Sequence, residues 1–416
     1  MSLFARFRLI PQTLRQPNYG VYVAGNSLSL VGSWMQRVAV GWLAWELSQS
    51  GTVLGLVAFA DLATTLLVGP FGGVLADRFD RRLLLTLGQS VNMTLSFLLA
   101  ALTASGAMTV PLLILIIGIN GAVIGINQPA RLSLISGLVP KAYLPTAVAI
   151  NSLVFNLARF IGPAIAGLII LSSGTALVFL LNAFSFISFL IALHRLDLPP
   201  RKVDPAKAAP PPMFQAIAQG LSYVANHQGI GPLLALNATL AITARPYVEL
   251  LPGFADDVFG RGAGGLAILS SAVGLGAILA GLFLAQRGQK DGLSNTALLA
   301  TLLIALSALG LAISPNFWLA IIMVTLGGFG MVTAGVGTQT LVQTSVDETI
   351  RGRVLSLFGL IFRSGPALGA LAMGVASEWV GLRLPLAIGS LIGVLGFLYV
   401  WRRRSVISRA LQTHVA

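Results

Sequence analysis

The sequence predicts an all-α membrane protein with twelve transmembrane helices in two pseudo-symmetric six-helix bundles and both chain ends in the cytoplasm. Of the 416 residues, 56% are hydrophobic and only 9% are charged, whereas charged residues make up about a quarter of a soluble domain. The 46 glycines and the lack of sustained period-two alternation favour closely packed helices over a β-barrel. Basic residues also concentrate in alternate connections between apolar runs, which sets the orientation.

Apolar runs bounded by charge, glycine or proline predict the helices in order. They lie near residues 19–46, 52–75, 83–104, 109–130, 145–171, 174–194, 229–252, 262–285, 293–314, 316–343, 352–378 and 383–402. The start of the chain has arginines but no apolar core followed by a cleavage site, so we expect no signal peptide. The expected domains are a cytoplasmic segment at 1–18, a bundle at 19–194, a cytoplasmic linker at 195–228, a bundle at 229–402 and a cytoplasmic tail at 403–416.

The distribution of basic residues predicts that both ends face the cytoplasm. Of the 26 lysines and arginines, only Arg261 and Arg383 fall in connections assigned to the outer side, and four more lie inside predicted helices. Such asymmetry over short loops orients membrane proteins. The net charge of +13 therefore indicates contact with anionic lipids of the inner leaflet, and we expect no nucleic-acid partner.

The segment between the two bundles predicts a linker followed by a surface helix. Residues 197–212 are rich in proline and polar residues, which disfavours a helix. From Phe214 to His227 the apolar residues recur on one helical face, which predicts a short helix on the inner membrane surface or an extension of the seventh helix. The chain has no cysteine, so neither disulfides nor thiolate metal sites are possible.

A compact charged turn separates the second and third predicted helices. It runs from Gly72 to Arg82 and contains Gly73, Asp77 and Arg78. The two halves also repeat weakly at a spacing near 205 residues. Two pairs of sequences match: Arg159-Phe160-Ile161-Gly162-Pro163 with Arg363-Ser364-Gly365-Pro366, and Arg37 with Arg245. A duplicated six-helix bundle explains this spacing.

The charged turn closely resembles the signature that the major facilitator superfamily carries between its second and third helices, except that Asp80 replaces the usual glycine. The segments 128–131, 151–163 and 351–354 look like the branch that contains enterobactin exporters and macrolide efflux proteins. The 162–167 segment resembles, in degenerate form, the G-P-x-x-G-G stretch of drug/proton antiporters. The resemblance implies a transporter with parallel halves and a substrate site between them near the bilayer midplane.

The resemblance also implies a gate at the cytoplasmic side. In the family, the equivalent of Asp77 contacts the start of the eleventh helix, where a carboxylate is favoured by exposed N–H groups. We therefore expect a cytoplasmic latch that holds an outward-open state; a purely topogenic role of the turn is the alternative. The expected latch residues are Gly73, Asp77, Arg78, Arg82, Arg351 and Arg353.

Ionisable residues inside predicted helices are the candidates for substrate binding, because a charge in hydrocarbon needs a partner, water or a function. Arg37 and Asp61 lie at similar depths, and we expect them to pair, either as a proton-coupling pair from which substrate displaces Asp61 or as a static salt bridge. Glu249 lies one turn after Arg245 and is the second candidate for proton coupling.

Four arginines against two carboxylates favour an anionic substrate, since guanidinium offers a planar fork of donors. The expected cavity residues are Trp34, Arg37, Arg159, Arg245 and Arg363. Arg159 and Arg363 accompany the helix-bending pairs Gly162-Pro163 and Gly365-Pro366, and either arginine could instead donate to carbonyls that the prolines leave free. The catecholate siderophores implied by the enterobactin-exporter resemblance suit such a cavity.

These observations predict a secondary, proton-coupled exporter of a small amphiphilic and anionic compound, acting as a monomer in the inner membrane. Its partners are the substrate, protons and lipid. A nutrient importer or facilitator and a non-transporting receptor are the alternatives. An enzyme is disfavoured because His194, His227 and His414 fall in loops or tails. We expect no cofactor, no metal and no ATP-driven step, because neither a metal-ligand cluster nor a nucleotide-binding loop appears in the sequence.

Overall fold

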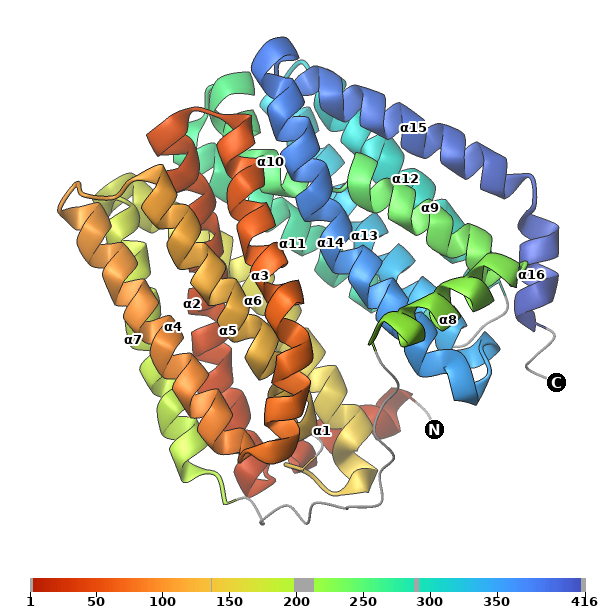
Figure 1. The fold of residues 1–416 in the computed structure, drawn as a ribbon, viewed down its shortest axis with the longest axis horizontal. Coiled ribbons are helices and arrows are strands. Elements are labelled where there is room, and N and C mark those ends of the chain that lie inside the picture. Colours follow the sequence, from red (N-terminus) through yellow and green to blue (C-terminus); the bar gives the residue numbers. More distant parts are fainter. Residues whose placement is uncertain (1–2, 136, 198–212, 288–291, 413–416) are drawn as a thin grey trace. The chain divides into compact units, whose positions relative to one another are not determined.

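The computed structural model describes residues 3–135, 137–197, 213–287 and 292–412, and all elements of regular secondary structure among them are helices (Figure 1). The first elements are α1 (Leu3–Leu14), α2 (Pro17–Ser48), α3 (Gly51–Arg78), α4 (Arg81–Ala104), α5 (Val110–Ile135), the 3₁₀ turn η1 (Lys141–Tyr143), α6 (Leu144–Ser173), α7 (Thr175–Arg195) and α8 (Met213–Asn226). They are followed by α9 (Ile230–Thr243), α10 (Tyr247–Gly253), the π turn η2 (Phe254–Val258), α11 (Gly262–Arg287), α12 (Leu293–Ile313), α13 (Phe317–Ser345), α14 (Glu348–Val380), α15 (Arg383–Trp401) and α16 (Arg404–Gln412).

The chain forms two compact units whose boundaries fall inside helices. Unit 1 comprises residues 1–49, 56–205 and 261–271, and unit 2 comprises residues 50–55, 206–260 and 272–416. The first turn of α3 therefore belongs to unit 2, and the first ten residues of α11 belong to unit 1.

Unit 1 is held together by glycine contacts and by a buried polar network. A Cβ on Gly25 would lie 2.5 Å from Cβ of Ala192, so α2 and α7 approach closely there. Further along the same pair of helices, Gln36 Oε1 accepts hydrogen bonds from Ser96 Oγ and Asn182 Nδ2, both at 2.7 Å. All three polar side chains are buried, and buried polar groups remain stable only when they are paired in this way.

Close packing through small residues, which the 46 glycines predict, is seen at the segments 121–125, 162–167 and 327–337. A Cβ on Gly125 would stand 2.7 Å from the Thr65 carbonyl oxygen of α3. A Cβ on Gly328 would overlap the Val273 carbonyl of α11. Close backbone approach through glycine is a common way for helices to associate in membranes, and this prediction is confirmed.

By length and composition, ten helices of the described residues are suited to cross a membrane. They are α3 to α7 and α11 to α15. The helix α2 is long enough, with 32 residues, but it is not apolar enough to be counted as a membrane span. The helices α9 and α10, with 14 and 7 residues, are too short to span a membrane. An all-helical membrane protein is thus supported, while twelve spans and cytoplasmic ends stay predictions.

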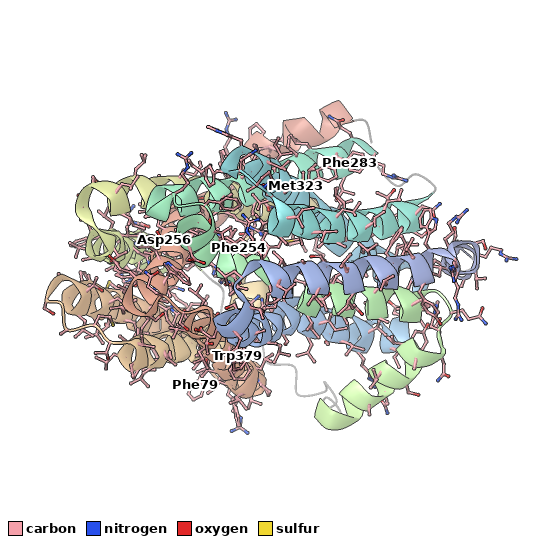
Figure 2. The ribbon with its side chains drawn as sticks, turned by 90° about the horizontal axis from the view of Figure 1, so that it is seen from above. Phe79, Phe254, Asp256, Phe283, Met323 and Trp379 are labelled. Atoms are coloured by element: carbon pink, nitrogen blue, oxygen red, sulfur yellow. The ribbon has the colours of Figure 1, made fainter. Side chains whose placement is uncertain are left out.

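The predicted continuous seventh helix, 229–252, is wrong. The chain instead forms α9 and α10, separated by Ala244, Arg245 and Pro246. Pro246 has no N–H to donate and disfavours a helical residue before it. The π turn η2 follows α10 directly and carries Phe254, which is fully buried, and Asp256 (Figure 2). Broken helices and π turns are both frequent at functional sites.

The short helix predicted at 214–227 is present as α8 and is separate from the seventh helix, so the alternative of an extension is wrong. Its place on the inner membrane surface stays a prediction. His227 separates the two helices, because its Nδ1 accepts hydrogen bonds from the N–H groups of Gly229 and Ile230 at 3.0 and 3.1 Å. This side chain caps α9, whose own N-cap residue makes no side-chain bond. Most of the predicted linker, residues 198–212, lies outside the described residues.

Candidate substrate-binding clusters

In unit 1, two of the predicted arginines share one indole ring. The Cζ atom of Arg159, on α6, lies 5.5 Å from the ring centre of Trp34, on α2, and that of Arg37 lies 5.9 Å from it. Phe155, one turn before Arg159, packs edge-on against the same ring at 5.6 Å. Guanidinium groups near an indole face are attracted by its quadrupole, by about 0.5–1 kcal/mol each where water has access. We call these four residues the Trp34 cluster.

The backbone of α6 positions the Trp34 cluster. Gly162 is buried against α2, where a Cβ would stand 2.6 Å from Cβ of Trp34 and 3.1 Å from the Val31 carbonyl oxygen. Pro163 follows within the continuous helix. Since Arg159 and Gly162 are three residues apart, they share one face of α6. The contact at Gly162 therefore places Arg159 beside the indole.

In unit 2, Arg245 lies at the break between α9 and α10, with its Cζ 4.0 Å from the ring centre of Phe362 on α14. Gly365, one turn after Phe362, is buried, and a Cβ there would stand 3.0 Å from the Ala241 carbonyl carbon of α9. The repeat predicted from sequence thus has a structural counterpart. In both units an arginine meets an aromatic ring of another helix close to a tight glycine contact between the helices.

Arg363 and Pro366 take no part in that contact. Arg363 is exposed, and Pro366 lies inside the continuous helix α14. Next to Arg363, the buried Ser364 has a hydroxyl group without a hydrogen-bond partner in the described part of the chain. The sequence missed Phe155 and Phe362 as members of the clusters, and they do not occupy equivalent positions in the repeat.

The two predicted proton-coupling carboxylates belong to different units. Asp61 is partly exposed on α3, where α5 approaches closely and Thr65 Oγ1 bridges the carbonyl oxygens of Asp61 and Gly121 at 2.7 and 2.8 Å. Glu249 is partly exposed on α10, one turn after Arg245. Their roles stay predictions.

At the charged turn, Arg82 is bound within unit 1. Its guanidinium donates to the carbonyl oxygens of His194 and Leu196 at the end of α7. Asp80, the residue that departs from the family signature, caps α4 by accepting the Leu83 N–H at 2.9 Å. Gly73 has open space around it, and Arg78 is exposed. The side chain of Asp77 lies outside the described residues.

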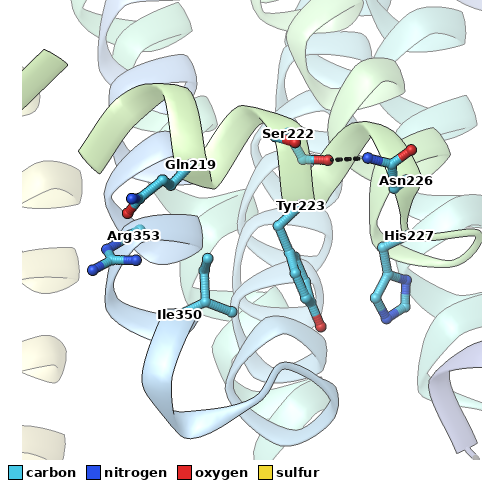
Figure 3. Close-up of a pocket in the computed structure, with 7 residues that line it drawn as sticks. All are labelled: Gln219, Ser222, Tyr223, Asn226, His227, Ile350 and Arg353. Carbon is cyan, nitrogen blue, oxygen red and sulfur yellow. Dashed lines mark hydrogen bonds between the residues drawn. The ribbon is translucent and has the colours of Figure 1, made fainter. Parts of the chain in front are cut away.

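On α14, Arg351 Nε donates to the Val346 carbonyl oxygen at 3.0 Å, closing the turn that precedes the helix. Arg353 lies one half-turn further on and faces α8 (Figure 3). The latch proposed for these residues stays a prediction.

Two solved structures share the fold of this chain. A transporter of the POT family in complex with 5-aminolevulinic acid aligns with a TM-score of 0.72 over 94% of this chain and 96% of that chain, at 14% identity. The nucleoside transporter NupG aligns with a TM-score of 0.64 over 94% of this chain and 98% of that chain, at 14% identity. The chain has the major facilitator fold.

The sequence comparison identifies the family. A family profile described as transmembrane secretion effector matches residues 11–411, and the chain belongs to this family of the major facilitator superfamily. The staphyloferrin A transporter of Staphylococcus aureus is 25% identical over 87% of this chain and 90% of its own. The enterobactin exporter of Shigella flexneri is 27% identical over 79% and 76%, and macrolide efflux protein A of Streptococcus pyogenes is 22% identical over 86% and 89%.

The chain is therefore a multi-pass membrane protein of a transporter family related to siderophore transporters and macrolide efflux proteins. The resemblance read from the sequence is confirmed.

Proposed function

We propose that the protein is a secondary active exporter that moves a small amphiphilic anion, such as a siderophore or drug, across the inner membrane in exchange for protons, by alternating access. The Trp34 cluster is the observation that carries this proposal. An indole with two guanidiniums within 6 Å offers apolar surface for the body of such a compound and donors for its charge. Arg245 over Phe362 offers the same pairing a second time.

The relatives support the export direction and the type of compound. Two of them are named for a siderophore, one of these as an exporter, and another is named for efflux of a macrolide. At about 25% identity the substrate itself does not carry over. The chemistry of the Trp34 cluster favours a compound that is both anionic and aromatic, because a neutral compound would gain little from two arginines.

Proton coupling is proposed through Asp61 and Arg37. If the substrate binds the guanidinium of Arg37, a carboxylate paired with this arginine loses its counter-charge and is protonated more easily. Protons and substrate would then compete for the same pair, which is the requirement of an antiporter. Glu249 near Arg245 is the second candidate for this exchange.

The experiment is substrate flux driven by a proton gradient in proteoliposomes, across a panel of catecholate and carboxylate siderophores and neutral drugs. We expect Asp61→Asn to abolish the gradient dependence, whereas the exposed Asp257→Asn, on the π turn, is its matched control. Gradient-driven flux that survives Asp61→Asn unchanged would refute the coupling scheme. Anion recognition would be refuted if the wild-type protein transports neutral compounds and Arg159→Gln leaves this flux unchanged.

The direction is tested separately in intact cells and everted vesicles. Export predicts accumulation of substrate in everted vesicles and loss from loaded cells. Uptake into intact cells would instead favour a nutrient importer or facilitator. Binding without flux in either preparation would favour a non-transporting receptor.

A further inference from the structure

A cavity of about 500 Å³ lies within unit 2, between α8 and the first turns of α14 (Figure 3). On the α14 side it is lined by Ile350 and Arg353. Gly220 brings the helices together, because a Cβ there would stand 3.3 Å from the Arg353 carbonyl oxygen. On the α8 side the lining residues recur every three or four positions, so they share one helix face. They are Gln219, Ser222, Tyr223 and Asn226, followed by His227.

The lining is rich in hydrogen-bond donors. Arg353 contributes the guanidinium, and Ser222 and Tyr223 contribute hydroxyl groups. Asn226 donates one amide hydrogen to the Ser222 carbonyl oxygen at 2.8 Å, which leaves its second amide hydrogen for a ligand. His227 accepts two backbone N–H groups at Nδ1, so its ring proton lies on Nε2, and this nitrogen is a donor as well.

The charge of the lining favours an anion. Arg353 is the charged member of the lining, which contains no carboxylate among the described residues. Asp347 lies near the cavity, and burial, with the charge of this carboxylate as the second cause, raises the pKa of Tyr223 above its ordinary value. A phenol at its ordinary pKa of about 10 already keeps its proton over the physiological range, so Tyr223 is a donor there.

The position of α8 indicates where the anion comes from. Leu221, on this predicted inner-surface helix, is 56% exposed although it is apolar, as expected where lipid covers it. α16, which begins at Arg404, contacts the start of α9 through Leu411 and Gly229, and its exposed arginines add positive charge near that end of α8. Basic residues near amphipathic helices attract anionic lipids.

We propose that the cavity between α8 and α14 binds the phosphodiester of an anionic lipid headgroup, with Arg353 as its charged contact. Phosphate oxygens accept several hydrogen bonds at once and match a guanidinium in geometry. A headgroup such as phosphatidylglycerol has no cation of its own to be repelled by Arg353, whereas phosphatidylcholine does. Binding here is independent of the compound that the protein transports.

The test is native mass spectrometry of the purified full-length protein with equal amounts of phosphatidylglycerol and phosphatidylcholine. We expect wild type to retain phosphatidylglycerol preferentially, and Arg353→Gln to weaken this retention about tenfold, as for loss of a charged hydrogen bond. Arg195→Gln, an exposed arginine at the end of α7 in unit 1, is the matched control and should retain the lipid. Equal retention of the two lipids by wild type, or equal loss in both variants, overturns the proposal.

Tyr223→Phe guards against an effect of misfolding, because it keeps the ring and removes only the hydroxyl donor. We expect about a threefold loss of phosphatidylglycerol with an unchanged apparent melting temperature, and no loss at all would contradict the proposal. Calorimetric titration with glycerol 1-phosphate distinguishes the two sources of phosphate. Binding as tight as that of a short-chain phosphatidylglycerol would overturn the assignment to a lipid in favour of a soluble phosphate ester.

Discussion

Gly162 is the position where α6 and α2 meet at the Trp34 cluster, and Gly162→Ala perturbs this contact with a single methyl group. The new Cβ would stand 2.6 Å from Cβ of Trp34, roughly 0.8 Å inside ordinary van der Waals contact. Relieving such an overlap costs about 1–3 kcal/mol, against a gain of about 1 kcal/mol from replacing glycine by alanine within a helix. We expect a net loss of stability of up to about 2 kcal/mol.

The same displacement acts on the substrate site. If Trp34 moves away from Arg159 and Arg37, two cation–aromatic contacts worth about 0.5–1 kcal/mol each are weakened. If the substrate's own contacts with the displaced cluster weaken by a similar amount, about 1–2 kcal/mol, the KM for transport rises roughly 5- to 30-fold. Because the methyl group touches no ionisable residue, we expect the proton dependence of the remaining flux to be unchanged.

Two measurements check this prediction, thermal unfolding in detergent and initial flux in proteoliposomes as a function of substrate concentration. The matched control is Gly281→Ala on α11, where a Cβ would meet nothing within 4 Å. If Gly162→Ala has the melting temperature and the KM of this control, the close contact does not position the Trp34 cluster, and the reasoning is wrong.

Two further predictions concern stability. Gln36→Leu leaves the buried donors of Ser96 and Asn182 without their shared acceptor. We expect this substitution to lower the stability of unit 1 by about 1–3 kcal/mol, measured by denaturant unfolding. An unchanged unfolding midpoint would contradict the role of this network. The Ser50 hydroxyl donates a hydrogen bond to the Glu378 carboxylate at 2.6 Å, and Glu378→Gln weakens this acceptor. We expect this substitution to lower the melting temperature in detergent more than the exposed Asp257→Asn does. Equal shifts of the melting temperature in the two variants would count against this bond.

Several elements followed from local sequence. The helix near 83–104 could be placed because an apolar run follows the charged turn, and the structure shows that Asp80 caps its first turn. The helix α8 followed from its apolar period, and close packing of helices through glycine followed from the composition. These features depend on neighbouring residues or on small size, both of which are visible in the sequence.

The broken seventh helix shows where pattern reading fails. Residues 229–252 are mostly apolar apart from Arg245 and Glu249, and a hydropathy average does not reveal that Pro246 lacks an N–H group. The ending of α8 was equally hidden, because the capping acceptor is the side chain of His227, a residue type that is not a common N-cap.

By itself, the sequence determined the family and the helical membrane fold. It also identified the arginines in the apolar segments, because a charged residue inside hydrocarbon is energetically unfavourable and therefore rare. Only the tertiary structure decided which aromatic rings those arginines meet. Trp34 and Arg159 are 125 positions apart in the chain, and their contact depends on how closely α6 approaches α2 at Gly162. Such distances are set by packing between helices, which no local pattern of residues encodes.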